Sequence, residues 1–312
     1  MVLAESEIQA LTTKFAQNVE QALRIGKVES VIALGLTQVL RKIAENSLTE
    51  EQFARYFHIF GQDHFRSPQI EFLPHATFTE AMVTRTVSSY TENYLFYGSA
   101  YEFNDKMRVL TWENYLQPFI ESLPPRSLTN STSTRRTILN FGCGLGSDAF
   151  RLTAHNCQVI AVDAAATMIS TLQLVNNDKV FALWQDMRDF DLPITADIDQ
   201  SPQPIHQVDG ILVDSAIQHV SHEDVYTMAH TFGRWLPPGA PLLMRLRPHH
   251  TGHIFRVLDQ VGERFFSTWT RSQIHHLTAD ISPLFDLEAQ WSRPHADQDR
   301  PGFEAILLRR KA

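Results

Sequence analysis

The N-terminal third of the chain has the apolar spacing of amphipathic helices. Apolar residues recur every three to four positions from Leu11 to Leu23, and again from Val28 to Ile43. This spacing places them on one face of each helix. The pattern therefore predicts an α-helical region over residues 1–122. We expect this region to act as a cap or as an oligomerisation element, so a homo-oligomer formed through these helices is one expectation.

The pattern changes after residues 123–136, a polar linker rich in Ser, Thr and Pro. Over residues 137–312, short apolar runs alternate with amphipathic segments. This alternation is typical of an α/β fold, in which helices cover both faces of a mostly parallel sheet. The apolar runs that we expect to be strands lie at residues 138–141, 158–162, 180–184, 208–213, 239–245, 284–291 and 303–309.

Composition narrows the class of protein. A hydrophobic fraction of 43% with 20% charged residues is ordinary for a soluble globular protein, and 312 residues suffice for one large domain or two modest ones. The formal net charge is −8, and no dense stripe of Lys and Arg is present. A nucleic-acid enzyme needs positive surface to neutralise phosphates, so we expect no nucleic-acid partner.

Cysteine usage and the N-terminus give two further expectations. The two cysteines, Cys143 and Cys157, are too few for a disulfide framework or a cysteine-based metal site. Residues 1–7 have no basic segment leading into an apolar run, so they do not form a signal peptide, and no apolar run reaches transmembrane length. We expect a cytoplasmic protein with no metal and no membrane partner.

The most informative motif follows the apolar run at residues 138–141. There the chain passes through Gly142, Gly144 and Gly146 and then enters a helical segment. Glycine lacks the Cβ atom that would hold a ligand away from the backbone N–H groups. A second predicted strand ends at Asp163, 21 residues after Gly142 (163 − 142), close to the spacing of about 20 expected for a carboxylate that binds a ribose diol. This combination predicts a nucleoside-binding βαβ unit.

The glycine spacing separates two classes of cofactor. A dinucleotide site favours G-x-G-x-x-G, but position 147 is Ser, and Asp148 would place a carboxylate near a pyrophosphate. The motif instead resembles that of the class I S-adenosylmethionine-dependent methyltransferases. The resemblance runs from about Thr137 to the C-terminus. It implies a Rossmann-like, mostly parallel seven-stranded sheet with helices on both faces, preceded by the α-helical N-terminal region, and S-adenosyl-L-methionine as cofactor, with S-adenosyl-L-homocysteine as product.

The resemblance also implies roles for individual residues. Asp163 would bind both ribose hydroxyls and Met168 would begin the helix beside the adenine, while Asp186 and Met187 would contact the adenine itself. Asn140 stands where the family usually carries an acidic residue near the methionine ammonium, so a charged contact is replaced by an amide. The residues that it implies for cofactor binding are Asn140, Gly142, Cys143, Gly144, Asp163, Ala164, Met168, Asp186, Met187 and Asp214.

The acceptor side is predicted from position and chemistry. His219 and Asp214 follow the fourth predicted strand of the core, so both are catalytic candidates: His219 as a base or as a residue that orients the acceptor, and Asp214 as a partner for an amine or as a helix cap. Tyr97, Tyr101, His219, Arg245 and His249 are the candidate substrate residues. For the tyrosines, simple core packing is the alternative, and for Arg245 the alternative is an ion pair with one of the many acidic side chains.

Together these observations predict methyl transfer to an O or N atom of a small organic acceptor. Two alternatives stay open at this point. One is a methyltransferase of a protein or RNA, for which the N-terminal helices would be a docking module. The other is a non-catalytic scaffold that binds the cofactor, an idea that Asn140 mildly favours.

Overall fold

The computed structural model describes residues 69–97, 115–125, 127–128, 135–173, 178–198, 201–214, 216–259, 261–293 and 302–312. The helices expected before residue 61, and with them the predicted oligomerisation element, lie outside the described residues, as does Tyr101.

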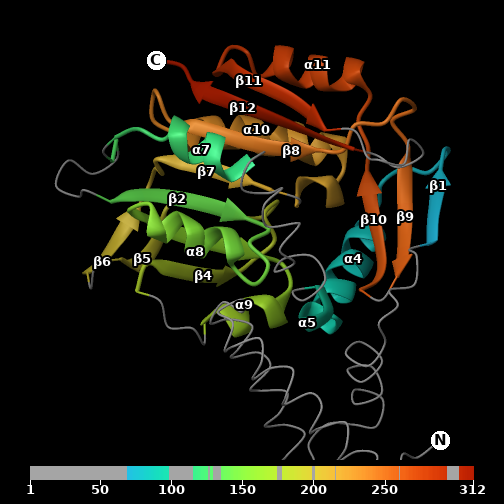
Figure 1. The fold of residues 1–312 in the computed structure, drawn as a ribbon, viewed down its shortest axis with the longest axis horizontal. Helices are drawn as coiled ribbons and strands as arrows, with labels where there is room; N and C mark the ends of the chain where they lie inside the picture. The colour runs from blue at the N-terminus through green and yellow to red at the C-terminus, as the bar shows by residue number, and fades with distance from the viewer. Residues whose placement is uncertain are drawn as a thin grey trace, which may run out of the picture.

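A seven-stranded sheet forms the centre of the fold, with strand order β11-β12-β8-β7-β2-β3-β4 (Figure 1). The strands from β4 to β8 pair in parallel, and β12 pairs antiparallel with both β8 and β11. The prediction of a mostly parallel seven-stranded sheet is confirmed. The strands are β2 (Arg136–Phe141), β3 (Cys157–Asp163), β4 (Val180–Trp184), β7 (Gly210–Val213), β8 (Pro241–Leu246), β11 (Phe285–Arg293) and β12 (Phe303–Arg310).

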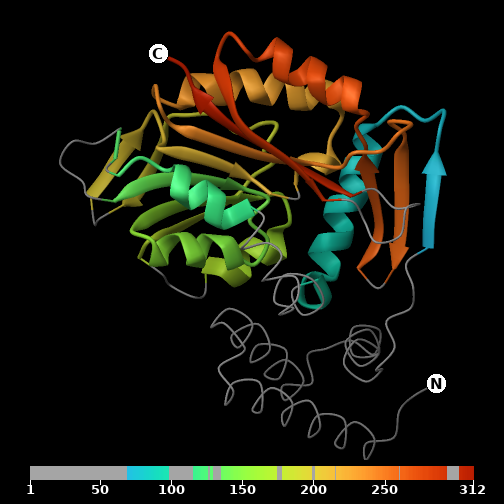
Figure 2. The same cartoon turned by 45° about the horizontal axis from the view of Figure 1, so that its top comes forward.

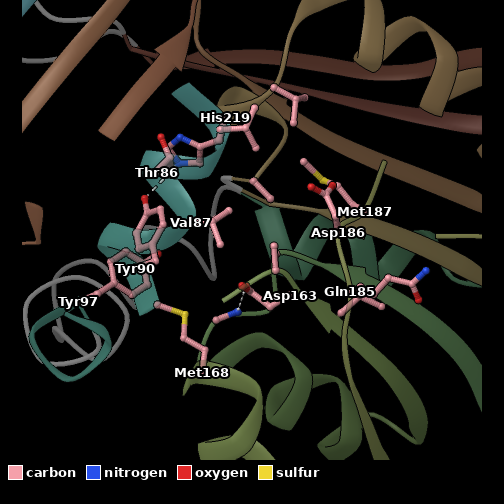
Figure 3. Close-up of a pocket in the computed structure, with 17 residues that line it drawn as sticks. Thr86, Val87, Tyr90, Tyr97, Asp163, Met168, Gln185, Asp186, Met187 and His219 are labelled. Atoms are coloured by element: carbon pink, nitrogen blue, oxygen red, sulfur yellow. Dashed lines mark hydrogen bonds between the residues drawn. The ribbon is translucent and has the colours of Figure 1, made fainter. Parts of the chain in front are cut away.

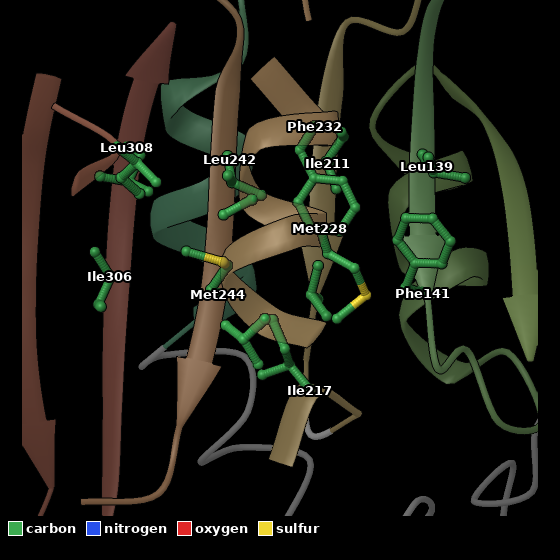
Figure 4. Packing of buried hydrophobic residues seen from close by; sticks show 14 of the residues in the cluster. Leu139, Phe141, Ile211, Ile217, Met228, Phe232, Leu242, Met244, Ile306 and Leu308 are labelled. Carbon is green, nitrogen blue, oxygen red and sulfur yellow. The ribbon is translucent and has the colours of Figure 1, made fainter. Parts of the chain in front are cut away.

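Helices cover both faces of this sheet. Apolar residues of α10 (His222–Trp235) and α11 (Arg271–Asp280) pack on one face, and those of α7 (Gln117–Ser122), α8 (Ser147–Ala154) and α9 (Ala166–Gln173) pack on the other. Figure 4 shows the first of these layers, in which Phe232 of α10 lies beside Phe141 of β2, with ring centroids 5.4 Å apart. The central strands are buried on both sides, which explains why they read as continuous apolar runs.

A second, three-stranded antiparallel sheet has the order β1-β9-β10. Its strands are β1 (Gln69–Leu73), β9 (Ile254–Asp259) and β10 (Gly262–Ser267). The sequence pattern predicted only helices before residue 122, yet β1 is a strand in that region. Its first four residues, from Gln69 to Phe72, alternate between polar and apolar, which suits a strand that packs on one face.

Helix α4 (Glu80–Glu92) connects this second sheet to the central one. It packs against β10 and α9, and the short helix α5 (Tyr94–Tyr97) follows it. Figure 2 shows α4 and the second sheet standing at the end of the central sheet toward which β2 points. Residues 69–97 and 254–267 are therefore neighbours in space, although in the sequence they lie before and after the linker predicted at residues 123–136. The division into a region 1–122, a linker and a core 137–312 stays a prediction.

Two smaller elements complete the described fold. Between β4 and β7, the chain forms a hairpin of β5 (Ile194–Ile198) and β6 (Ser201–Ile205). After β7, a single 3₁₀ turn, η3 (Ile217–His219), leads to the Ser221 cap of α10. This cap is a capping box, in which the Ser221 side chain accepts from the Asp224 N–H and the Asp224 side chain accepts from the Ser221 N–H. It fixes where α10 begins and thus where His219 lies.

Candidate functional site

A pocket lies at the carboxyl ends of the parallel strands, between these ends and α4 (Figure 3). This edge is where α/β sheets ordinarily bind ligands, because the loops that leave successive strands meet there. Four such loops contribute, those after β2, β3, β4 and β7. The lining residues are Val83, Thr86, Val87, Tyr90, Tyr97, Gly142, Gly144, Val162, Asp163, Ala164, Met168, Gln185, Asp186, Met187, Ala216, His219 and Val220.

The glycine loop brings bare backbone to the pocket. Gly142 has φ +63° and Gly144 has φ +54°. This left-handed backbone conformation is strained for any residue that carries a side chain. A Cβ atom on Gly142 would lie 2.1 Å from the Cβ of Ala216 in the loop after β7. Glycine is therefore required at position 142 both for the conformation and for the close approach of the two loops.

Asp163 holds the loops after β2 and β3 together. One carboxylate oxygen accepts from the Gly144 N–H at 2.9 Å, and the other accepts from the Ala165 N–H at 2.8 Å. Burial and the negative charge of Asp186 raise the pKa of Asp163 above its ordinary value, although the hydrogen bonds from the Ala165 and Gly144 N–H groups favour the carboxylate. Each oxygen keeps a lone pair for a further donor, so Asp163 can accept hydrogen bonds from a ligand hydroxyl in the pocket.

Asn140 lies beneath the glycine loop and is almost fully buried. Its side-chain Nδ2 has no hydrogen-bond partner among the described residues. Buried amide groups ordinarily form hydrogen bonds. A donor without a partner beside the glycine loop is therefore suited to a hydrogen bond with an acceptor on the ligand. The amide offers a donor and an acceptor, which suits the amino-acid end of a zwitterionic ligand.

Asp186, after β4, is held by an arginine. Arg188 donates to both carboxylate oxygens of Asp186 and also to Glu80, the first residue of α4. Burial opposes the ionisation of Asp186, but the hydrogen bonds and charge of Arg188 outweigh it and lower the pKa of this carboxyl. The three side chains tie α4 to the loop that forms one side of the pocket.

His219 and Tyr90 form a hydrogen-bonded pair inside the pocket (Figure 3). The His219 Nδ1 lies 2.8 Å from the carbonyl oxygen of Phe265, so it carries the proton and donates. Its Nε2 is then an acceptor, and the Tyr90 hydroxyl donates a hydrogen bond to it, with the two atoms 3.1 Å apart. Burial, together with the charges of Arg264 and Arg247, lowers the pKa of His219 to about 3. The imidazole is therefore neutral, and both of its nitrogens are engaged.

Asp214 and Arg245 form a buried ion pair at the ends of β7 and β8. The Arg245 guanidinium also lies over the rings of Tyr115 and Phe303, 4.4 Å from each centroid. Neither Asp214 nor Arg245 lines the pocket, and the same is true of His249, which stacks on Phe72 of β1 with centroids 4.9 Å apart.

The structure brings most of the predicted cofactor residues together. Those that line the pocket are Gly142, Gly144, Asp163, Ala164, Met168, Asp186 and Met187. Asn140, Cys143 and Asp214 do not line it. Of the predicted substrate residues, Tyr97 and His219 line the pocket, whereas Arg245 and His249 do not. The roles assigned to all of these residues stay predictions.

The sequence pattern did not predict that α4 contributes to the pocket. Val83, Thr86, Val87 and Tyr90 recur at helical spacing and form one wall of the pocket. Their spacing marks a buried helix face, but the same spacing serves any core helix. Tyr90 lies in a stretch rich in aromatic residues together with Tyr94, Phe96, Tyr97 and Tyr101, and this enrichment is a sequence signal that could have pointed to it.

No helix in the described part of the chain is long and apolar enough to cross a membrane. Within the same residues, no group of three or more His, Cys, Asp or Glu side chains is arranged to hold a metal ion. The cytoplasmic location stays a prediction.

Comparison with family models gives a match in the part of the chain that carries the loops after β2, β3, β4 and β7. The model of a family described as a methyltransferase domain matches residues 138–239, which run from β2 to the turn before β8. A search of curated protein sequences gives no match.

Solved structures share the fold. A structure of the DhpI–SAH complex is 18% identical, with a TM-score of 0.52, over 75% of this chain and 98% of that one. A 1,6-didemethyltoxoflavin-N1-methyltransferase from Burkholderia thailandensis, solved with its substrate and S-adenosylhomocysteine, is 15% identical, with a TM-score of 0.50, over 80% of this chain and 99% of that one. A SAM-dependent methyltransferase from Leishmania major is 12% identical, with a TM-score of 0.53, over 73% and 83% of the two chains. At these identities the likeness establishes the fold.

Proposed function

We propose that residues 138–239, which match the model of a methyltransferase domain, form a Rossmann-like, S-adenosylmethionine-dependent core, and that the chain methylates an O or N atom of a small organic acceptor. The observation that carries the proposal is the pocket itself. One half consists of the glycine loop, Asp163 and the loop after β4, and the other half consists of Tyr90, Tyr97 and His219. In this proposal the donor site and the acceptor site share one cavity.

The donor half fits S-adenosylmethionine by its chemistry. Asp163 would accept from the ribose hydroxyls, and the bare backbone at Gly142 and Gly144 would let the ligand lie against the loop. The unpartnered amide of Asn140 would bond to the amino-acid end, and Met168 and Met187 offer apolar contact for the adenine. The cofactor supplies an activated methyl group on a sulfonium, so the protein has only to align the acceptor and exclude water.

In the acceptor half, His219 acts on Tyr90 rather than on the acceptor directly. While the His219 Nε2 accepts from the Tyr90 hydroxyl, that nitrogen cannot also take a proton from an acceptor. The pair fixes the direction of the Tyr90 O–H, and the Tyr90 oxygen can still accept a hydrogen bond from an N–H or O–H group of the acceptor. We therefore assign Tyr90 to orienting the acceptor and His219 to positioning Tyr90.

Two features favour a small acceptor over a macromolecule. The acceptor half is walled by side chains of α4, α5 and η3, which suits a molecule that enters a cavity. The net charge of −8 disfavours RNA, which binds to positive surfaces. We include no nucleic acid and no membrane among the proposed partners.

Calorimetric titration of the full chain with S-adenosylhomocysteine, and separately with NADH, tests the donor site. We expect micromolar affinity for S-adenosylhomocysteine, a loss of at least tenfold in Asp163→Ala, and no change in the matched control Asp178→Ala, which alters an exposed aspartate before β4. Absence of binding by the wild type, or a preference for NADH, would overturn the cofactor assignment.

A second measurement tests the acceptor. The protein is incubated with S-adenosylmethionine labelled in the methyl group and with pools of small phenols, amines and carboxylic acids, in parallel with bulk tRNA and a protein extract. Label in a small product supports the proposal. Label in tRNA or protein would support a macromolecular substrate instead, and binding of the cofactor without any labelled product would support a non-catalytic scaffold.

A further inference from the structure

Three arginine guanidinium groups lie next to the acceptor half of the pocket. Arg245 and Arg247 are at the carboxyl end of β8, and Arg264 is on β10. Their proximity is evident from the rings that they share, because Arg245 and Arg247 both lie over Phe303, and Arg247 and Arg264 both lie over Phe266. Such a concentration of positive charge inside a protein is costly unless anions balance it.

Two of the three arginines have an anionic partner. Arg245 pairs with Asp214, and Arg264 pairs with Asp259. Arg247 differs from both, because its one hydrogen bond among the described residues runs from Nε to the neutral amide oxygen of Gln218, at 2.5 Å. Its two terminal nitrogens donate to no described residue.

Aromatic rings hold the Arg247 guanidinium in place without neutralising it. The group lies 4.5 Å from the ring centroid of Phe303 and 4.9 Å from that of Phe266. Stacking of this kind restricts the orientation of the group and leaves its N–H donors at the edge available. Burial and the like charge of Arg245 lower the pKa of Arg247 to about 9, so the side chain is still protonated near neutral pH.

Arg247 is joined to the pocket through Gln218. This residue precedes His219, and its side-chain nitrogen lies 3.5 Å from the His219 Nε2. Arg264, the neighbour of Arg247 over Phe266, lies 5.6 Å from the ring centroid of Tyr90. Both His219 and Tyr90 line the pocket. Arg247, which no described residue neutralises, does not itself line the pocket and lies one side chain behind the residues that we assign to the acceptor.

We propose that the acceptor carries a carboxylate group, which binds the Arg247 guanidinium while the reacting O or N atom lies beside Tyr90 and Tyr97. This inference rests on the proposed function and specifies its substrate class. A carboxylate accepts two parallel N–H bonds from a guanidinium, and the two unused terminal nitrogens of Arg247 provide such donors. Binding would also supply the anion that Asp214 and Asp259 supply to the other two arginines.

Calorimetry with matched acid and amide pairs tests the proposal. The probes are benzoate with benzamide, 3-phenylpropanoate with 3-phenylpropanamide, and hexanoate with hexanamide, each titrated into the full chain with and without saturating S-adenosylhomocysteine. We expect wild-type protein to bind at least one acid ten times or more tightly than its amide. Arg247→Gln should lose this preference while its affinities for the amide and for S-adenosylhomocysteine stay unchanged.

Two further variants separate recognition from a structural role. Arg247→Met keeps an apolar side chain between Phe266 and Phe303 and should lose the preference in the same way, so the test does not depend on Arg247→Gln folding. Arg85→Gln removes an exposed arginine of α4 and should keep the preference. If no acid is preferred over its amide, or if the preference survives the loss of Arg247, the proposal is wrong. Failure of the proposed function would instead be seen as absent binding of S-adenosylhomocysteine.

Discussion

At the scale of single residues, Gly142 links the stability of the protein to its pocket. In Gly142→Ala, the left-handed backbone costs about 1–2 kcal/mol and overpacking against Ala216 adds about 1–3 kcal/mol. We expect the free energy of unfolding to fall by roughly the sum of these terms, and the affinity for S-adenosylhomocysteine to fall with it. Urea denaturation and calorimetry measure the two effects.

Gly239→Ala is the matched control for this substitution. Gly239 also has a positive φ, +86°, but a Cβ atom there would meet nothing closer than the Cδ1 of Leu128, at 4.0 Å. This variant should lose only the backbone term of about 1–2 kcal/mol and keep its ligand affinity. Equal losses of stability in the two variants would show that the contact with Ala216 contributes nothing.

Residues of the donor half can be predicted from sequence because their signals are local. Gly142, Gly144 and Asp163 lie within one βαβ unit, where the spacing along the chain fixes the spacing in space. Tyr90 cannot be found in this way, because its partner His219 is 129 positions away and only the packing of α4 brings them together. Asn140 is predicted as a ligand residue, and its lack of a partner becomes visible only in the structure.

At the scale of elements, α4 depends on hydrogen bonds to the backbone of β10. The Thr86 hydroxyl accepts from the Phe265 N–H at 3.0 Å. Thr86→Val keeps the shape of the side chain but leaves this N–H without a partner in a buried place. We expect the free energy of unfolding to fall by about 1–3 kcal/mol, measured by urea denaturation.

Thr84→Val is the control on the same helix. The Thr84 hydroxyl is exposed and bonds only to the carbonyl oxygen of Glu80, one turn earlier. The change in helix propensity is the same as at position 86, and the effect should stay within about 0.5 kcal/mol. If Thr84→Val costs as much as Thr86→Val, the loss is one of helix propensity and the bond to β10 is not important.

The elements of the central sheet are largely predictable, whereas the second sheet is not. Strands buried on both faces produce continuous apolar runs, which are visible without knowing their partners. The strands β9 and β10 follow β8 in a stretch for which the sequence pattern predicted no strand. The strand β1, which pairs with β9, lies about 180 residues earlier, as in the pairing of Phe72 with Phe255. Pairing over such a distance leaves no local pattern beyond a short alternation.

At the scale of the whole molecule, buried histidines couple stability to pH. His219 is neutral in the pocket, and burial also lowers the pKa of His222, whose ring packs on Trp269 with centroids 3.9 Å apart. Both bond to backbone carbonyls of residues 265–268. In the unfolded chain the same side chains take up protons below about pH 6.5. The unfolded state therefore binds more protons in acid, and the protein should lose stability as the pH falls.

The other shifted groups act in different ranges of pH. The pKa values of Glu80 and Asp186 are lowered. Their contribution to stability is therefore lost only as the pH falls below the ordinary pKa of a carboxyl group, toward the lowered pKa of the folded state. The raised pKa of Asp163 has the opposite sign, because the folded state holds that proton more tightly and so gains stability as the pH falls. Comparing the wild type with histidine variants cancels these carboxylate terms, since both proteins contain them.

We expect this comparison to isolate the two histidines. The free energy of unfolding of wild-type protein, minus that of His219→Gln or His222→Gln, should decrease as the pH falls from 6.5 toward 4.5, by up to about 1.4 kcal/mol per pH unit for each histidine. Urea denaturation at half-unit steps of pH measures this difference. Parallel curves for His219→Gln and wild type would mean that His219 is protonated equally in the folded and unfolded states. The assignment of His219 as a neutral imidazole that is hydrogen-bonded at both nitrogens and positions Tyr90 would then be wrong.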